Sequence, residues 1–494
     1  TKTNHTMKQI TLLLTLLCAA TLTQAQVGIG TTIPATSSIL DVSSTSKGFL
    51  PPRMTAAQRD AIDSPIAGLM IWCTESLELQ IYNGTRWINS TGSGPSCILL
   101  GSDIDGEATN DRSGSVSLSS DGSTVAIGAY QNDGNGANSG HVRVYENISG
   151  TWTKIGVDID GEAAGDYFGW SVSLSGDGSA VAIGAMGNGG NGTASGHVRV
   201  YENISGTWTK VGSDIDGEAT YDYSGYSVSL SSNGSVVAIG AYGNDGSSGN
   251  GSTSSSGAPG HVRVYENISG TWTQVGSDIN GAASGDNSGR SVSLSSDGSV
   301  VAIGAFYNDD SYVDAGHVRV YEKNVSGNWI QVGGDIDGEK ANDQSGRSVS
   351  LSSDGSTVAI GTNYNDGNGV SAGHVRIYKN ISNTWTQIGA DIDGEKAGDA
   401  MGGIGNVSLN SDGTIVAIGA GGAEGNTGTN AGGVYIYRNI SGTWTQIRST
   451  IYGETVSDAA AAVSLSSDGS TVAIGAASND GNGSASGHVR VYAK

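Results

Sequence analysis

Several residue types are scarce in this chain. Its 494 residues include 3 cysteines, 3 phenylalanines and 6 prolines, and charged residues make up 14%. Leucine, lysine and glutamate are rare while 79 residues are glycine, a composition that disfavours long helices and favours short strands joined by tight turns. Positive charge is also low, since 24 Lys and Arg stand against 47 Asp and Glu, giving a net charge of −23. This excludes an electrostatic nucleic-acid binder and indicates a surface suited to cations.

One long apolar run is present, near the start. From Met7 the chain reads MKQITLLLTLLCAATLTQAQ, with small residues placed for cleavage before Gln26. This pattern is typical of a secretory signal peptide and is too short for a membrane span. We therefore expect residues 1–25 to be upstream residues plus signal peptide, and the product to be exported, with no transmembrane segment after cleavage. The expected location is extracellular or the outer cell surface, with the periplasm as the alternative. Cys73 and Cys97 remain, either as a disulfide or as two thiols.

A repeat organises the rest of the chain. The tetrapeptide VAIG begins at Val125, Val181, Val237, Val301, Val358, Val416 and Val472. Each copy predicts four strands, which in the first repeat are strand A (SVSLS, 115–119), strand B (TVAIGA, 124–129), strand C (HVRVY, 141–145) and strand D (TWTKIG, 151–156). Asp-Gly or Asn-Gly between strands A and B is a hairpin turn. Four antiparallel strands in each of seven repeats predict an all-β, seven-bladed β-propeller, with a β-solenoid as the alternative.

The two ends of the repeat array complement each other. The last repeat stops at GHVRVYAK (487–494) and lacks strand D, whereas an extra strand, ILLGSDIDG (98–106), precedes the first repeat. We expect this N-terminal strand to complete the last blade and close the ring, which removes the free sheet edges.

The second repeat resembles an FG-GAP repeat, the blade unit of the integrin α-chain propeller. Phe168-Gly169 match the FG, Ile183 to Ala185 match the start of GAP, and Gly196 to Tyr201 match the next strand. The resemblance extends over all repeats, about residues 97–494, and implies a propeller with a binding function. The long calcium loop that such blades often carry between strands A and B is replaced here by a tight turn.

The segment before the repeats differs in composition. Residues from Gln26 to about Gly94 resemble a leader module of exported Bacteroidetes surface proteins, some with tail-fibre character. We expect a few strands, a short helix capped by Thr55 and an Asn83-Gly84 hairpin there. The expected domains are thus residues 1–25, a leader module at 26–95 and a propeller at 96–494.

Strand order places the D–A and B–C loops on one face of the ring, which carries many of the acids. The repeated DIDGE motif in the D–A loops is the candidate metal site, and calcium is the one candidate ion, although no cofactor is required. The alternative is a turn whose acids are solvated or pair with Arg on strand C. The candidate ligands are Asp103, Asp105, Glu107, Asp158, Asp160, Glu162, Asp214, Asp216, Glu218, Asp335, Asp337, Glu339, Asp391, Asp393 and Glu395. The six histidines of the GHVRV motif are expected to pack between blades.

The repeats differ most at the start of strand A and in the B–C loops. Aromatic rings stack on sugars or side chains, and arginines pair with carboxylates or sulfates. The candidate ligand-binding residues are Trp170, Tyr226, Arg290, Arg347, Tyr167 and Tyr223, with packing between blades as the alternative.

No catalytic motif stands out from the repeats, because the reactive residues occur in many copies. We therefore expect an exported or cell-surface, non-enzymatic binding or adhesion propeller that recognises a glycan or protein on its acidic loop face, without nucleic acid as a partner. The alternatives are a carbohydrate-active or other hydrolytic enzyme on the same scaffold and a structural surface or filament subunit.

Overall fold

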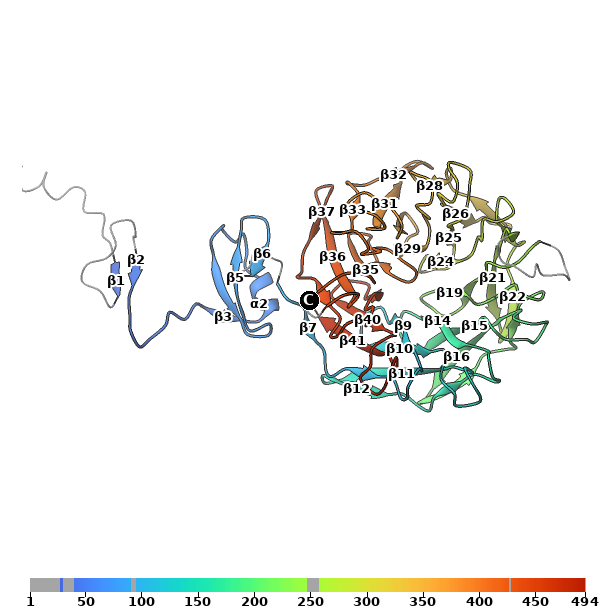
Figure 1. Cartoon of the computed structure of the whole chain (residues 1–494), viewed down its shortest axis with the longest axis horizontal. Helices are drawn as coiled ribbons and strands as arrows, with labels where there is room; N and C mark the ends of the chain where they lie inside the picture. Colours follow the sequence, from blue (N-terminus) through green and yellow to red (C-terminus); the bar gives the residue numbers. More distant parts are fainter. Residues whose placement is uncertain (1–26, 30–39, 90–94, 247–256, 426–427, 494) are drawn as a thin grey trace, which may run out of the picture. The chain divides into compact units, whose positions relative to one another are not determined.

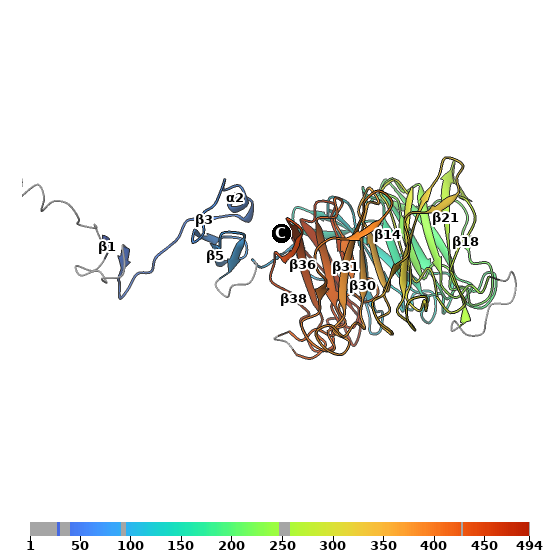
Figure 2. The ribbon, with the colours of Figure 1, turned by 90° about the horizontal axis from the view of Figure 1, so that it is seen from above.

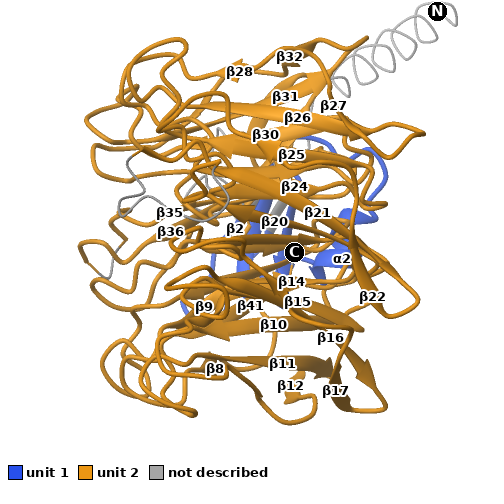
Figure 3. Cartoon of the chain, turned by 90° about the vertical axis from the view of Figure 1, so that its right-hand side faces the viewer, with its two compact units in different colours: residues 1–82 blue, residues 83–494 orange. Residues whose placement is uncertain are grey.

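The computed structural model describes residues 27–29, 40–89, 95–246, 257–425 and 428–493. The signal peptide predicted at residues 1–25 lies outside the described residues, as does most of the long B–C loop of the third repeat. The chain divides into two compact units, residues 1–82 and residues 83–494 (Figure 3). No helix in the described part of the chain is long and apolar enough to cross a membrane.

The first unit holds short strands and one short helix. Strand β1 (Val27–Ile29) pairs in parallel with β2 (Leu40–Val42). Strand β3 (Arg53–Met54) pairs in parallel with β4 (Met70–Cys73), which pairs antiparallel with β5 (Glu78–Tyr82). The predicted Thr55 cap is present on α2 (Ala56–Asp60), where the Thr55 side chain accepts from the Gln58 amide and the Gln58 side chain accepts from the Thr55 amide.

The second unit is built from antiparallel sheets that follow one another around a common centre (Figure 1). After β6 (Trp87–Asn89), each repeat forms a sheet in the order D-C-B-A. The A strands are β9 (Ser113–Leu118), β14 (Phe168–Leu174), β19 (Ser227–Leu230), β24 (Ser291–Leu294), β29 (Ser348–Leu351), β34 (Val407–Leu409) and β39 (Ala462–Leu465). The B strands are β10 (Thr124–Ala129), β15 (Ala180–Ala185), β20 (Val236–Ala241), β25 (Val300–Ala305), β30 (Thr357–Thr362), β35 (Ile415–Ala420) and β40 (Thr471–Ala476). The prediction of an all-β propeller with four-stranded antiparallel blades is confirmed.

The outer half of each blade contains strands C and D. The C strands are β11 (His141–Ile148), β16 (His197–Ile204), β21 (His261–Ile268), β26 (His317–Lys323), β31 (His374–Asn380), β36 (Gly433–Ile440) and β41 (His488–Ala493). The D strands are β12 (Thr151–Lys154), β17 (Thr207–Lys210), β22 (Thr271–Gln274), β27 (Trp329–Gln331), β32 (Trp385–Gln387) and β37 (Thr443–Gln446). The strands of successive blades lie side by side when the unit is seen from above (Figure 2).

A fifth segment, which the sequence did not predict, belongs to each sheet. The first two residues of IDG, ING or IYG form a short strand that pairs with the start of strand C, so that the D position is filled by two pieces. These segments are β8 (Ile104–Asp105), β13 (Ile159–Asp160), β18 (Ile215–Asp216), β23 (Ile279–Asn280), β28 (Ile336–Asp337), β33 (Ile392–Asp393) and β38 (Ile451–Tyr452). In the last sheet, β7 (Ile98–Leu99) and β8 both pair with β41. The start of the propeller thus lies beside its last strand.

The apolar core is divided among the contacts between neighbouring sheets. One cluster joins the first and second repeats through Ile183, Val142 and Phe168, and another joins the last and first repeats through Val489 and Ile127. Tryptophans of strand D reinforce these contacts, because the indole Nε1 of each donates to a backbone oxygen of the preceding repeat, as Trp208 does to Ile155 at 2.9 Å. The same bond is made by Trp152, Trp272, Trp329, Trp385 and Trp444.

The serine of VSL explains why strand A is repeated almost unchanged. The Ser117 hydroxyl accepts a hydrogen bond of 2.9 Å from the Leu174 amide of the next repeat. Equivalent bonds run from one blade to the next at Ser173, Ser229, Ser293, Ser350 and Ser408, and Ser464 of the last repeat accepts from Leu118 of the first. Backbone hydrogen bonds also join the A–B turns of successive blades. In the last of them the Ser467 amide of the seventh repeat donates to the Ser120 oxygen of the first at 2.7 Å.

Candidate functional site

Two cavities lie along the innermost strands. The wider, of about 330 Å³, is lined by residues at the start of strand A, among them Trp170, Tyr226, Arg290 and Ile404. The narrower, of about 150 Å³, lies at the other end of these strands and is lined by their leucines and by serines of the A–B turns. Because B–C and D–A loops surround the wider cavity, this opening, which we call the mouth, is where variable side chains meet.

Of the predicted ligand-binding aromatics, Trp170 and Tyr226 line the mouth, and Tyr167 and Tyr223 lie behind them against neighbouring rings. The Trp170 ring lies 4.8 Å from the ring of Tyr130, edge to face, and 5.4 Å from that of Tyr226. Tyr226 continues the row onto Tyr242, with ring centroids 4.7 Å apart. The two remaining tyrosines touch the same row, Tyr167 through Tyr130 and Tyr223 in a stack on Tyr242. The aromatic residues thus form one continuous arc across successive blades.

The predicted arginines extend this arc. The guanidinium of Arg290 lies 4.6 Å from the ring centre of Tyr226, 4.7 Å from that of Tyr242 and 4.9 Å from that of Phe306. Arg347 lies 4.9 Å from the Phe306 ring centre and 5.1 Å from that of Tyr364. Cation–π attraction holds both guanidinium groups in place. Neither has an ion pair or hydrogen bond within the described parts of the chain, and the Nε atom of each is buried without a partner.

Sequence reasoning missed part of this arc. Tyr130, Tyr242 and Phe306 each follow directly after VAIGA, at the end of strand B. Strands A and B are antiparallel neighbours, as in the pairing of Ser227 with Gly240, so the residue that precedes strand A and the residue that follows strand B reach the same opening. The sequence could have indicated these residues, because the residue after VAIGA varies among the repeats just as the residue after SG does.

Burial at the mouth shifts the acidity of its polar groups. Desolvation raises the pKa of Tyr242 to about 12, although Arg290 opposes this shift. Burial also lowers the pKa of Arg347, because its charge has lost water without gaining a carboxylate. The arc therefore holds two cations beside neutral phenols, on a chain whose net charge is −23.

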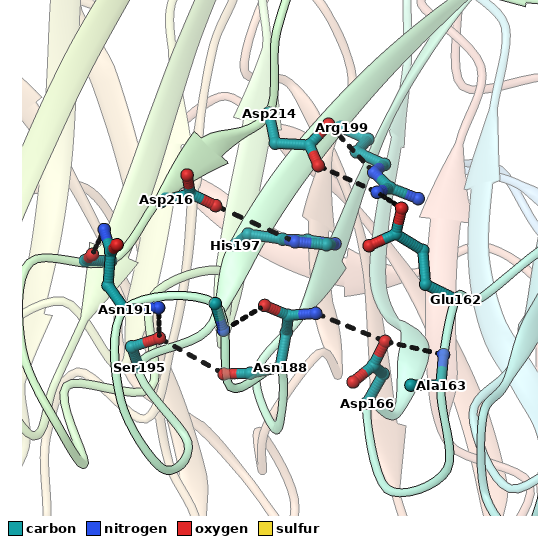
Figure 4. A network of polar contacts seen from close by, with 12 residues as sticks. Glu162, Ala163, Asp166, Asn188, Asn191, Ser195, His197, Arg199, Asp214 and Asp216 are labelled. Carbon is teal, nitrogen blue, oxygen red and sulfur yellow. Dashed lines mark hydrogen bonds and ion pairs between the residues drawn. The ribbon is translucent and has the colours of Figure 1, made fainter.

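The three acids of one DIDGE motif, predicted as metal ligands, do not come together around one point. At the first blade, the atoms that come within 4.8 Å of one another belong to Glu107 of one D–A loop, His141 of strand C and Asp158 of the next loop. The same combination recurs as Glu162, His197 and Asp214, which Figure 4 shows, and as Glu218, His261 and Asp278. Carboxylates of different loops, rather than the three acids of one loop, are thus brought together with a histidine.

An arginine of strand C enters each of these clusters. Arg199 donates from Nε and Nη2 to the two oxygens of Asp214, at 3.0 and 2.8 Å, and also pairs with Glu162 (Figure 4). The Arg143 guanidinium lies 3.3 Å from Glu107. Glu218, Glu339 and Glu454 lie beside Arg263, Arg376 and Arg490 in the same way. The arrangement favours the alternative in which these acids pair with Arg on strand C.

The remaining DIDGE acids stay close to strand C or to solvent. Asp335 accepts from Arg319 and from Gln331, and Asp391 accepts from Gln387. The second aspartates, Asp105, Asp160, Asp216, Asp337 and Asp393, lie in the short strands opposite the histidines. Asp103 lies 3.9 Å from His488, and burial raises the pKa of its carboxyl. Glu395 is exposed.

Burial keeps the strand C histidines neutral. It lowers the pKa of His261, His374 and His488 to about 4, and the neighbouring strand C arginine acts in the same direction. The histidines of the first, second and fourth repeats are shifted the same way.

Another repeated aspartate holds the loops of the mouth. Asp166 is 4% exposed and accepts from the Ala163 amide at 3.1 Å and from the Asn188 side chain at 3.2 Å (Figure 4). This joins a D–A loop to a B–C loop, and Asp111, Asp222, Asp286 and Asp343 make the same contacts. The rim that positions the aromatic arc is therefore rigidly hydrogen-bonded.

Cys73 and Cys97 are free thiols. Cys97 occupies the position at which other repeats carry the strand D tryptophan, and burial raises its pKa to about 11.

Two family models match parts of the chain. The model of the FG-GAP repeat matches residues 158–201, the segment on which the resemblance was recognised, so the presence of an FG-GAP repeat is confirmed. The model of a phage tail like trimerisation region matches residues 28–107. The comparison with curated protein sequences gave no match.

Similar solved structures include three sugar-lactone hydrolases by name. They are a candidate 6-phosphogluconolactonase from Bacteroides uniformis (12% identity, TM-score 0.48), one from Bacteroides fragilis (13%, 0.46) and the periplasmic gluconolactonase of Pseudomonas aeruginosa (15%, 0.47). Each likeness covers 77% of this chain, and 93%, 92% and 92% of the other chains in turn.

These names contradict the prediction that the chain is not an enzyme. That prediction came from the repetition of the reactive residues, and repetition does not argue against catalysis, because a site can be assembled from single positions in different blades. At this similarity the likeness concerns the fold and transfers neither an activity nor a substrate to this chain.

Proposed function

We propose that this protein is an exported binding propeller whose mouth takes a ligand carrying carboxylate or sulfate groups, on a glycan or a protein. The observation that carries this proposal is the pair Arg290 and Arg347, which lie between aromatic rings without a carboxylate partner in the described residues. In a chain of net charge −23, two neighbouring cations left without acids are unusual, and Arg290 lines the wider cavity.

The chemistry of the arc suits an acidic sugar chain best. Aromatic faces such as that of Trp170 stack on sugar rings, and a guanidinium group binds a carboxylate or sulfate with two parallel hydrogen bonds. The acids of the surrounding loops repel an anionic ligand elsewhere on this face, so such a ligand is favoured only where the two guanidinium groups meet it.

We further propose that the seven sheets form one closed ring, the finer part of the fold prediction. Three features support closure: the pairing of β7 with β41, the apolar cluster that joins the last and first repeats, and the circuit of serine hydrogen bonds that returns from Ser464 to Leu118. The mouth depends on it, because the arc is held in place by contacts between blades.

We propose that the N-terminal part of the chain directs export and joins several chains, so that one particle carries several binding sites. We place the signal peptide at residues 1–25, the leader module at 26–95 and the propeller at 96–494, with the mature chain at the cell surface or outside the cell. The match of residues 28–107 to a trimerisation region supports an assembly of three chains. Three mouths on one particle raise avidity for a repetitive ligand such as a polysaccharide.

An array of acidic and neutral glycans and of acidic proteins, probed with the purified chain, tests the binding proposal. We expect signals on carboxylated or sulfated members that disappear when Arg290 and Arg347 are both replaced by alanine. Binding that is unchanged in this double variant contradicts the proposal.

A further inference from the structure

The first unit has very little apolar interior. Among its described residues, the buried apolar ones are Pro51, Ala56, Ile71 and Cys73. The rest of its interior is polar, because Arg59 (2% exposed) donates to Gln80 (0% exposed) at 2.7 Å. Domains of about 40 residues seldom bury enough apolar surface to fold alone and usually need a staple or partner chains. Cys73, the one described cysteine of the unit, is a free thiol, so no disulfide staples it.

Large apolar side chains of this unit instead face solvent at one end of its sheet. Phe49 is 63% exposed, Leu50 65%, Ile66 78%, Leu69 36% and Met70 42%. The parallel register pairs Arg53 with Trp72, and the Trp72 amide donates to the Pro52 oxygen. Continued backward, this register places Leu50 beside Leu69 and Phe49 beside Gly68, and the Leu69 amide donates to the Ile66 oxygen. We call these five residues the apolar end.

The sequence around the apolar end lacks charge. Residues 48–52 (GFLPP) and 64–74 (SPIAGLMIWCT) contain no Asp, Glu, Lys or Arg, in a chain where acids are otherwise spread along every repeat. Edges and patches that must stay in water are normally protected by charged side chains. The unit thus buries few apolar side chains and exposes an uncharged apolar cluster. This pattern is typical of a surface that becomes covered when the protein assembles.

We propose that the apolar end is the surface through which three copies of this chain join, and that its burial completes the core of the first unit. This inference rests on the proposed function, in which the leader is the trimerising part. Two further copies of the chain are the occupant we commit to, because the matched trimerisation region, residues 28–107, includes all five residues of the apolar end. Around a threefold axis, neighbouring copies contact each other through different surfaces, and the same residues of all three copies meet only at the axis itself. We place the apolar end at this axis, where each copy covers the patch of the other two.

The test measures the mass of the full chain in solution by light scattering coupled to size-exclusion chromatography. We compare the unaltered chain with a Leu50→Glu, Ile66→Glu double variant. The matched control is Ile148→Glu, which places the same charge on an apolar residue that is 54% exposed at a hairpin tip of the propeller. Calorimetry of each variant follows the melting of the propeller separately from that of the first unit.

We expect three chains for the unaltered protein and for the control, and one chain for the double variant, with the propeller transition unchanged. A trimeric double variant overturns the apolar end as the joining surface while leaving the proposed trimer intact. A monomeric unaltered chain overturns the proposed trimer itself. If the double variant loses the first-unit transition together with its trimeric mass, and dilution of the unaltered chain lowers the same transition, folding of the unit depends on assembly, as the inference requires.

Discussion

The guanidinium group of Arg290 lies 4.6 Å from the ring centre of Tyr226, on the neighbouring blade. The contact crosses from one repeat to the next, so the cation is held by the architecture of the ring and not by a local turn. A charge fixed in this way has already lost side-chain freedom and part of its water, and it can meet an anionic ligand at little further cost.

Replacing the residues of the arc should weaken binding without unfolding the propeller. Truncation of a central interface residue typically costs about 2 kcal/mol or more, roughly a thirtyfold loss of affinity. We expect a loss of this size for Trp170→Ala and for Arg347→Ala, measured by calorimetry with the ligand found on the array. Trp385→Ala on strand D is the control, and it should lower the melting temperature because its indole bonds the Val332 oxygen. Full-strength binding in both arc variants would move the site away from the mouth.

Deleting residues 97–101 should open the ring. The deletion removes β7, which leaves β41 with an unpaired edge and strips Leu100 from the cluster between the last and first repeats. Unpaired edges invite association between chains. We expect a lower melting temperature and soluble aggregates in chromatography. A propeller that melts at the original temperature and elutes as before would show that closure does not depend on this strand.

Removing one serine of the inter-blade circuit should destabilise the protein modestly. In Ser117→Ala the Leu174 amide loses its 2.9 Å acceptor, and a lost hydrogen bond of this kind costs about 1 kcal/mol. Denaturant unfolding measures the difference. Ser115→Ala is the comparison, because Ser115 lies on the same strand but lines the mouth. Equal stability of the two variants would mean that the circuit adds nothing to the fold.

The sequence predicted the blades well because each strand has its own local signal. Alternation and the Asp-Gly turns define strands A and B, and the repeated GHVRVY and TWT segments define strands C and D. The split of the D position into two pieces, as in β12 and β13, has no such signal, since it depends on how the chain returns across strand C.

The candidate site was predicted only in part for a related reason. Trp170 and Arg290 were found because they vary at a fixed position of strand A. Pairing of the DIDGE acids with Arg on strand C was one of the alternatives, but spacing within one loop cannot reveal which acid pairs with which arginine, such as Glu162 with Arg199 of the next repeat unit. Only the structure therefore shows which side chains of neighbouring blades contact each other.

Chelation should leave the melting temperature unchanged. The carboxylates that a calcium ion would need are engaged by arginines, as in the contacts of Arg199 with Asp214, and displacing a guanidinium group offsets what the ion would contribute. Calorimetric titration at millimolar calcium, with and without prior treatment by a chelator, measures this. A rise in melting temperature with calcium would restore the DIDGE acids as ligands, since an ion that binds only the folded form stabilises it.

Acid should destabilise the propeller over the interval in which its buried histidines resist protonation. The pKa of His261, His374 and His488 falls from 6.5 to about 4 in the folded chain. Between these values the unfolded chain binds more protons than the folded chain, so the free energy of unfolding decreases as the pH falls. The stability is fully present above pH 6.5 and is progressively lost toward pH 4. The buried carboxyl of Asp222, whose pKa is raised, acts in the opposite sense and reduces the effect.

Thermal melting across this interval measures the histidine contribution, and His374→Gln is the matched variant. Glutamine is of similar size and does not titrate, so the melting temperature of the variant should fall less steeply with acid than that of the unaltered chain. The slope should differ most between pH 6.5 and about 4, where His374 takes up a proton on unfolding in the unaltered chain and the glutamine of the variant does not. A variant with the same pH profile as the unaltered chain would show that the fold does not keep this histidine neutral.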